Sequence, residues 1–331
     1  MKKIINLLKN NISFILTLII TFFVLTFELP YYIEAPGGLI DLKNRYEIEQ
    51  SYDIKGSINM TYVSEYKATI ATFLIAKLNN DLDIYKKEEI LPNNITEEEN
   101  DFLGEMLLKE ASNNAIINAY KKAEKEYKIV DEKLYVTYIY EEAKTDLKIK
   151  DQIISVDGIN VKNKQEINNI IKNKNINDMI NIKVINNKKE YNRYAYVLKD
   201  NIIGIIATSN KKINTFPKIK VNYENNEFGS SGGLMTSLSI YSKLINYDIT
   251  NGYTVSGTGT IDDAGIVGEI DGVKYKLKGA VKENADIFLV PCGDNYKEAI
   301  KLKKENNYDI EIVEVKTFDD VINYLNKKRD I

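Results

Sequence analysis

The sequence predicts an α+β protein with more than one domain, carried behind a single apolar helix at its amino terminus. Its 331 residues allow two domains of about 100–200 residues each. Strand-like alternation at 56–63 and 147–161 is mixed with helical periodicity at 66–78 and 97–127. The apolar share of 44% and the charged share of 28% are those of an ordinary globular chain, which excludes wholesale disorder.

Missing residue types exclude several kinds of chemistry. The chain has no His and one Cys, so His bases, Ser-His-Asp triads, Cys-cluster zinc sites and intramolecular disulfides are excluded. We therefore expect no metal and no cofactor. No Gly-Lys dipeptide occurs, which excludes a Walker A loop and makes a nucleotide partner unexpected. The net charge of −3 also argues against a nucleic-acid partner. The base of any enzyme here must be Lys, Asp, Glu or Tyr.

The amino terminus is typical of a membrane anchor. Residues 10–27 carry no charge, and 18 helical residues span about 27 Å, close to one hydrocarbon core. Lys2, Lys3 and Lys9 precede this stretch, so the positive-inside rule predicts a cytoplasmic tail (1–9), a single-pass anchor (10–29) and an extracellular remainder at the cell membrane. A cleaved signal peptide is the rival interpretation, but it requires a shorter apolar core and a small-residue cleavage site.

The segment 30–127 is predicted to be a partly helical external region. It begins with a Pro-Gly-Gly turn at 36–38, continues with the strand at 56–63 and then has the two helices. The acidic run 97–99 lies where a helix amino end favours negative charge. We expect this region to pack on the last domain.

The block 128–200 is predicted to form a small domain around a hairpin. An Asp-Gly turn at 157–158 joins two alternating strands, and a helix at 164–172 and strands at 179–185 and 191–198 follow.

This block resembles a PDZ domain, because 147–158 carries that family's hydrophobic-x-x-Gly-Asp-x-Ile-x-x-Val-Asp-Gly signature with Lys150 in place of the Gly before Asp151. The resemblance implies peptide binding by strand addition, with a carboxylate-binding loop at Lys133-Leu-Tyr-Val136. The other interpretation is a PDZ fold used as a rigid spacer.

A glycine-rich turn in the last block, 201–331, carries candidate chemistry. Glu227-Phe-Gly-Ser-Ser-Gly-Gly-Leu-Met235 runs directly into an apolar helical pattern. Such a turn exposes a hydroxyl, and the backbone around Gly229 and Ser230 directs free N–H groups and the positive helix end at a developing oxyanion. By itself the motif is also typical of an ordinary loop or helix cap.

The residues after this turn give the motif its context. They predict a strand at 253–261, a tight turn at 262–265, a return strand at 266–270, a helix at 273–281 and a buried strand at 286–291. Asp262 and Asp263 are interpreted as part of the hairpin turn and not as a catalytic carboxylate pair.

This block resembles the proteolytic domain of Lon-type Ser/Lys proteases. The match places the nucleophile at Ser231, the base at Lys276 and the lysine-orienting threonine at Thr258. Ser230 stands where that family usually has Pro, and Gly232 where it has Ala. Two adjacent hydroxyls are therefore candidates, and the register of the motif favours Ser231.

The order of the segments resembles the membrane-bound PDZ-Lon peptidases of Gram-positive bacteria. The resemblance implies an ATP-independent serine endopeptidase that faces outward and cuts extracellular or surface peptides or unfolded proteins. Because Lon-type domains often assemble in rings, it also allows a homo-oligomer.

The chemistry of a Ser/Lys pair sets a condition on the lysine. Its ordinary pKa of about 10.4 keeps it protonated at neutral pH, and burial can lower that value by about 3–5 units.

The alternative function, which is not enzymatic, is a catalytically inactive, membrane-anchored peptide-binding scaffold, which a serine-reactive probe would not label. A signal-peptidase-like Ser/Lys enzyme is disfavoured by the position of the lysine, far after the serine.

Overall fold

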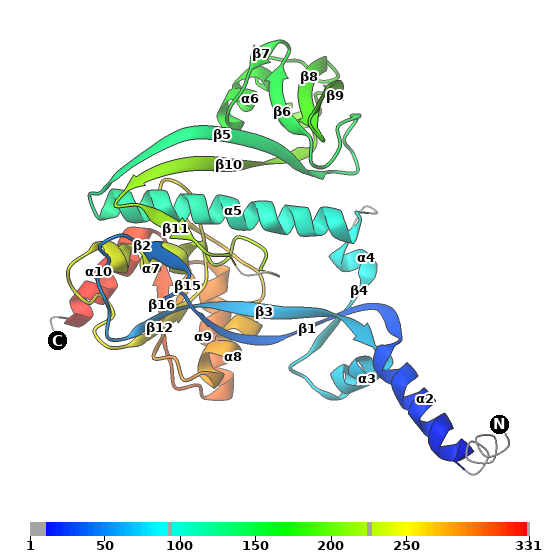
Figure 1. Ribbon diagram of the computed structural model, residues 1–331, viewed down its shortest axis with the longest axis vertical. Coiled ribbons are helices and arrows are strands. Elements are labelled where there is room, and N and C mark those ends of the chain that lie inside the picture. Colours follow the sequence, from blue (N-terminus) through cyan, green and yellow to red (C-terminus); the bar gives the residue numbers. More distant parts are fainter. Residues whose placement is uncertain (1–10, 92–94, 224–226, 330–331) are drawn as a thin grey trace, which may run out of the picture.

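The computed structural model describes residues 11–91, 95–223 and 227–329, which form two sheets with a long helix between them (Figure 1). The first sheet has the strand order β16 (Glu311–Val315), β15 (Ile287–Pro291), β12 (Thr254–Gly257), β3 (Ser57–Thr69), β1 (Glu28–Asp41), β4 (Asp83–Lys86). β12 pairs in parallel with β3 and β15, whereas β1 is antiparallel to β3 and β4. This mixed sheet joins the amino-terminal region to the carboxyl-terminal block.

The second sheet has the order β10 (Ile205–Phe216), β5 (Glu126–Ile139), β6 (Gln152–Val156), β8 (Met179–Asn186), β9 (Lys189–Tyr196), with β7 (Ile159–Asn160) paired to β6. We call residues 126–216 the second unit. β10 pairs with β5 from Ile205 to Phe216, so this sheet continues past the predicted domain boundary at residue 200. The predicted hairpin at 157–158 is confirmed, because Val156 pairs with Ile159 and both turn residues have positive φ.

The remaining elements are two small sheets and the helices. β11 (Ile219–Val221) pairs with β2 (Tyr46–Ile48), and β13 (Thr260–Ile261) pairs with β14 (Val267–Gly268). The described helices are α2 (Ile12–Thr26), α3 (Ile70–Leu78), α4 (Lys87–Ile90), α5 (Glu97–Lys122), α6 (Lys164–Ile171), α7 (Gly233–Leu244), α8 (Val273–Lys282), α9 (Asp294–Asn306), α10 (Phe318–Arg329).

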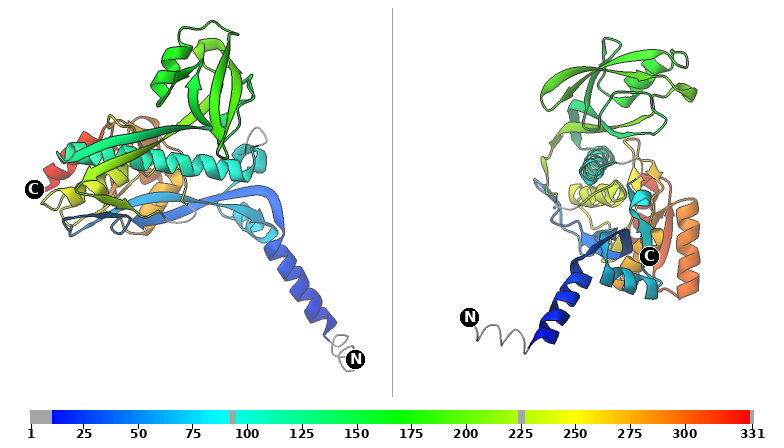
Figure 2. Two further views of the ribbon diagram at one scale, coloured as in Figure 1. Left: turned by 45° about the horizontal axis from the view of Figure 1, so that its top comes forward. Right: turned by 90° about the vertical axis from the view of Figure 1, so that its right-hand side faces the viewer.

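Helices cover both faces of the first sheet. Ile287 and Leu289 of β15 point to the cluster that contains α5, α7 and α10, while Phe288 and Val290 point to the cluster of α8 and α9. This alternation follows from the two-residue period of a strand. Figure 2 shows α5 between the second unit and α7.

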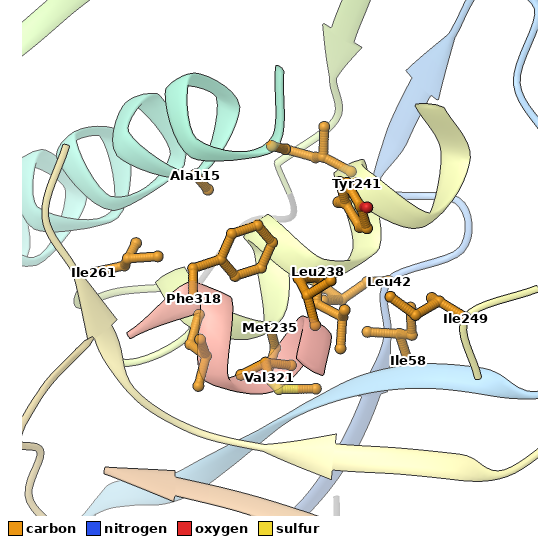
Figure 3. Close-up of a cluster of buried hydrophobic side chains, with 14 of the residues drawn as sticks. Leu42, Ile58, Ala115, Met235, Leu238, Tyr241, Ile249, Ile261, Phe318 and Val321 are labelled. Carbon is orange, nitrogen blue, oxygen red and sulfur yellow. The ribbon is translucent and has the colours of Figure 1, made fainter. Parts of the chain in front are cut away.

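The largest cluster fixes α7 over the sheet. Its buried side chains include Leu238, Met235 and Tyr241 of α7, Ile58 of β3 and Phe318 of α10 (Figure 3). Helix α7 has eleven buried residues among its twelve, so its amino end is held rigidly. The glycine-rich turn directly before it is therefore anchored to the core.

Helix α5 starts at a capping box. Thr96 Oγ1 accepts from Glu99 N–H at 3.2 Å, and Glu99 Oε2 accepts from Thr96 N–H at 3.0 Å. The acidic run 97–99 occupies the first turn, as predicted. The helix ends at Lys122 and not at 127, because Glu124 adopts φ of 54° and the strand β5 follows at once.

Two predictions in the amino-terminal region are wrong. Pro36–Gly38 is a bulge inside β1 and not a turn; a Cβ at Gly37 would lie 2.3 Å from the carbonyl oxygen of Tyr62 on β3. The predicted helix at 66–78 begins only at Ile70. Tyr66 and Lys67 pair with β1 instead, and Thr69 caps the helix.

Helix α2 projects away from the rest of the molecule (Figure 1). Its apolar side chains are exposed, among them Phe14, Phe22 and Leu25. Glu28 and Leu29, which were predicted to belong to the anchor, start β1. Over residues 11–91, 95–223 and 227–329, no helix has both the length and the apolar character needed to cross a membrane. The predicted tail, 1–9, and residue 10 lie outside the described residues.

Candidate active site

The turn at Gly229–Gly232 is held by helix α5. Gly229 has φ of 90°, and its N–H donates to the carbonyl of Gly104 at 2.9 Å. A Cβ at Gly104 would lie 2.8 Å from Cβ of Phe228, so the turn approaches α5 as closely as a glycine permits. The amide of Gly229, predicted to help form the oxyanion site, is thus engaged in holding the turn.

The amides that follow are better placed to bind an oxyanion. Gly233 N–H donates to Ser230 C=O at 3.1 Å, which closes the turn at the start of α7. Within the described part of the chain, the amides of Ser230, Ser231 and Gly232 have no acceptor. They precede a helix whose amino end carries partial positive charge.

The side chain of Thr258 contacts the main chain of Ser231. Ser231 C=O accepts from Gly259 N–H at 2.7 Å and from Thr258 Oγ1 at 3.1 Å. Thr258 is fully buried at the end of β12. No hydrogen bond joins Thr258 to Lys276 among the described residues, so the role of Thr258 in orienting the lysine amine stays a prediction.

Lys276 is the unusual lysine of α8. Its side chain is buried, with an exposed fraction of 5%, and its amine has no hydrogen bond or ion pair with any described residue. Lys274 and Lys278 on the same helix form ion pairs with Asp83 and Asp81 and are about one-third exposed. Lys276 therefore differs from Lys274 and Lys278 in being buried and in having no hydrogen bond or ion pair with a described residue.

The surroundings of Lys276 favour the neutral amine. Burial lowers the pKa of Lys276 to about 8, although the negative charges of Asp271 and Glu34 act in the opposite direction. Glu34 itself lies between two acidic cross-strand partners, Glu65 and Asp83. Burial raises the pKa of Glu34, and the negative charges of Asp83 and Asp271 act in the same direction.

Strand β3 connects the two halves of the site. A Cβ at Gly232 would lie 2.8 Å from Met60 Sδ, and a Cβ at Gly272, just before α8, would lie 2.7 Å from Val63 Cγ2. Met60 and Val63 are three residues apart, about 10 Å along a strand. No direct hydrogen bond between Ser231 and Lys276 is formed among the described residues.

The tight turn at 262–265 forms as predicted, but the predicted strand 253–261 is divided into β12 and β13, and the return strand is only Val267–Gly268. Asp262 Oδ1 accepts from Ala264 N–H at 3.0 Å and from Ile266 N–H at 2.8 Å, which closes the tight turn. Asp263 forms an ion pair with Lys211 of β10 at 3.1 Å. The two aspartates have separate structural roles.

The prediction of a carboxylate-binding loop at Lys133–Val136 is wrong. These residues lie inside β5, where Leu134 pairs with Ser209 of β10 on one side and with Ile153 of β6 on the other. Because both edges of the strand are already paired, a peptide cannot add to it here. Strand β10, which is not predicted from the sequence, occupies that edge.

Lys150 and Asp151, which occupy the Gly-Asp position of the PDZ signature, stabilise the fold of the second unit. Lys150, which replaces the glycine, has φ of 75°, a conformation that favours glycine. Asp151 is fully buried and accepts from Asn186 Nδ2 at 2.7 Å and from Arg193 Nε at 3.2 Å. The signature residues thus organise the fold of the unit.

A cavity of about 920 Å³ reaches the glycine-rich turn. It is lined by α5, β5, β10, the amino end of α6 and the hairpin of β13 and β14, and Ser230 forms part of its wall. Neither this cavity nor the role of Gly104 is predicted from the sequence; for Gly104, the available signal was an isolated glycine inside a long helical pattern.

The chain matches no protein-family model. It also matches no curated protein. Among solved structures, it is similar to the PDZ domain of the SdrC-like protein from Listeria monocytogenes, with 22% identity over 24% of this chain and 92% of that chain and a TM-score of 0.22.

Proposed function

We propose that this chain is an ATP-independent serine endopeptidase in which Ser231 is the nucleophile and Lys276 the general base. The observation that carries the proposal is the burial of Lys276, whose amine has no hydrogen bond or ion pair with a described residue, on a helix that packs on β3, the strand that the Ser231 turn also contacts. A lysine with a pKa near 8 is neutral in roughly a tenth of molecules at pH 7, which is enough to act as a base.

The proposed reaction has two stages. Neutral Lys276 takes the proton from Ser231 Oγ, which attacks the peptide carbonyl, while the amides of Ser231 and Gly232 donate to the oxyanion. The Lys276 ammonium then protonates the leaving amine, and an acyl-enzyme remains. Water, deprotonated by Lys276, hydrolyses that ester and restores Ser231.

We further propose that the uncharged segment 10–27 attaches the chain to the cell membrane with the catalytic part outside. The support is the uncharged apolar run and the three preceding lysines. Without an unfolding motor, substrates are peptides or unfolded proteins.

An inactive peptide-binding scaffold is the second candidate. It is favoured by the missing hydrogen bond between Ser231 and Lys276 among the described residues, although such bonds are often long before substrate binds. The paired edges of β5 weigh against it, because they remove the expected peptide-capturing strand.

The proposal is tested by incubating the purified full chain, without nucleotide, with a random peptide library and reading the products by mass spectrometry. We expect internal cleavage of unstructured peptides and no cleavage of stably folded proteins. A chain that leaves the library intact, and that a serine-reactive probe does not label, is a scaffold.

The pH dependence gives a separate prediction. Only the neutral lysine is a base, so kcat/KM should rise as pH increases through about 8. Asp271→Asn removes a negative charge that stabilises the ammonium, so it should lower the pKa of Lys276 and move the rising limb to lower pH. Asp309→Asn, at an exposed position of the α9–β16 connection, is the matched control and should leave the profile unchanged. Identical profiles in both variants would contradict Lys276 as the titrating group.

A further inference from the structure

The cavity beside Ser230 has an excess of negative charge. Five carboxylates and two lysines line it. Both lysines are already neutralised, because Lys164 pairs with Glu110 at 2.7 Å and Lys211 with Asp263 at 3.1 Å. The other three carboxylates, Glu132, Glu166 and Asp262, have no cationic partner among the described residues.

One buried serine holds two of these carboxylates in place. Ser209 of β10 is 4% exposed; its N–H donates to Glu110 Oε1 at 3.1 Å and its hydroxyl donates to Glu132 Oε1. Glu132 Oε2 is left without a hydrogen bond to any described residue. Glu166 and Asp262 instead stabilise local turns: the Glu166 carboxylate accepts from the Lys162 N–H before α6, and the Asp262 carboxylate accepts from backbone amides in the hairpin. Glu132 is therefore the carboxylate best placed to bind a ligand.

The same cavity also offers apolar surface. Ile129 of β5 is 41% exposed and Ile266, next to β14, is 56% exposed, and both lie on its wall. A long basic side chain suits this combination, because its alkyl stem packs on apolar groups while its charged end reaches a carboxylate.

We propose that this cavity is the substrate-binding cleft and that it selects extended peptides carrying Lys or Arg, with Glu132 as the specificity-determining residue. The inference rests on the proposed peptidase function, because Ser230 on the cavity wall is the residue before the nucleophile. A basic side chain that replaces water beside Glu132 gains a charge-assisted hydrogen bond. Peptides with neutral or acidic residues at the same position gain none.

The test compares cleavage of paired peptides that differ only by Lys or Gln at one position, scanned along both sides of the scissile bond. We expect the full chain to prefer Lys by about tenfold in kcat/KM at one position. Glu132→Gln should reduce that preference to less than about threefold, while Glu132→Asp, which keeps the charge, should retain most of it. Glu298→Gln, at an exposed position of α9, is the control and should keep the full preference.

Labelling of Ser231 by a serine-reactive probe separates the two ways of failing. A labelled, active chain with no preference for Lys, or with a preference that Glu132→Gln leaves intact, overturns the cleft assignment and keeps the peptidase. A chain that is neither labelled nor active overturns both. The preference of the parent chain for Lys should weaken as salt rises, whereas the small residual preference of Glu132→Gln should not change. Such a difference would further support an ionic contact.

Discussion

Ser231→Ala is expected to lower kcat/KM for peptide cleavage by a factor of about 10³ or more, because the acyl-enzyme cannot form without the hydroxyl. The fold should survive, since Ser231 contacts Thr258 and Gly259 through its carbonyl and not through its side chain. Cleavage of a fluorogenic peptide, together with a thermal melt of each preparation, measures both effects.

Ser230→Ala is the matched control for this prediction. Ser230 is adjacent to Ser231, lines the cavity and uses its own carbonyl to close the turn. Its variant should retain activity within about tenfold of the parent, because only side-chain contacts to substrate are lost. The opposite pattern, with Ser230→Ala inactive and Ser231→Ala active, would move the nucleophile by one residue.

Lys276→Met is expected to abolish cleavage and, at the same time, to stabilise the protein at neutral pH. The pKa of Lys276 falls from an ordinary value of 10.5 to about 8 on folding, so below pH 8 the folded chain carries a buried charge that the unfolded chain exposes to water. A difference of this size corresponds to about 3 kcal/mol of lost stability, and methionine removes that penalty.

The size of this effect depends on pH. Below pH 8 the amine is protonated in both states and the gain from Lys276→Met is fully present. As pH rises from 8 towards 10.5, the folded chain releases its proton first and the gain disappears. Urea unfolding of both chains at pH 7 and at pH 10 measures the difference.

Lys274→Met provides the comparison on the same helix. Lys274 is about one-third exposed and paired with Asp83 at 2.8 Å, so its loss should change the free energy of unfolding by less than about 1 kcal/mol. If Lys276→Met were destabilising at pH 7, or stabilising to the same extent at pH 10, the amine would not be a desolvated cation.

Local chemistry made several elements predictable. The Asp-Gly turn at 157–158, the aspartate-closed hairpin at 262–265 and the helix after Gly232 each depend on residues close in sequence. The difference between Lys276 and its neighbours also followed from position in the motif, and burial distinguishes it in the structure. These features need no knowledge of the tertiary fold.

Long-range pairing explains what the sequence did not reveal. Strand β1 contains a Pro-Gly-Gly stretch that is typical of turns, and only its pairing with β3 across Tyr62 makes it a bulge. The sequence predicts a loop at Leu134 because nothing nearby indicates that β10, 75 residues later, pairs with it at Ser209. The cavity is likewise assembled from segments that are distant in the sequence.

The measurement that tests the central claim most directly is covalent labelling with a fluorophosphonate probe, with the modified residue located by mass spectrometry. The full chain, Ser231→Ala and Lys276→Met would be treated at pH 7 and pH 9. We expect a single adduct on Ser231, formed faster at pH 9, absent from Ser231→Ala and strongly reduced in Lys276→Met at both pH values. Labelling that is absent from the full chain, or that proceeds equally in Lys276→Met, would contradict a Ser231–Lys276 dyad.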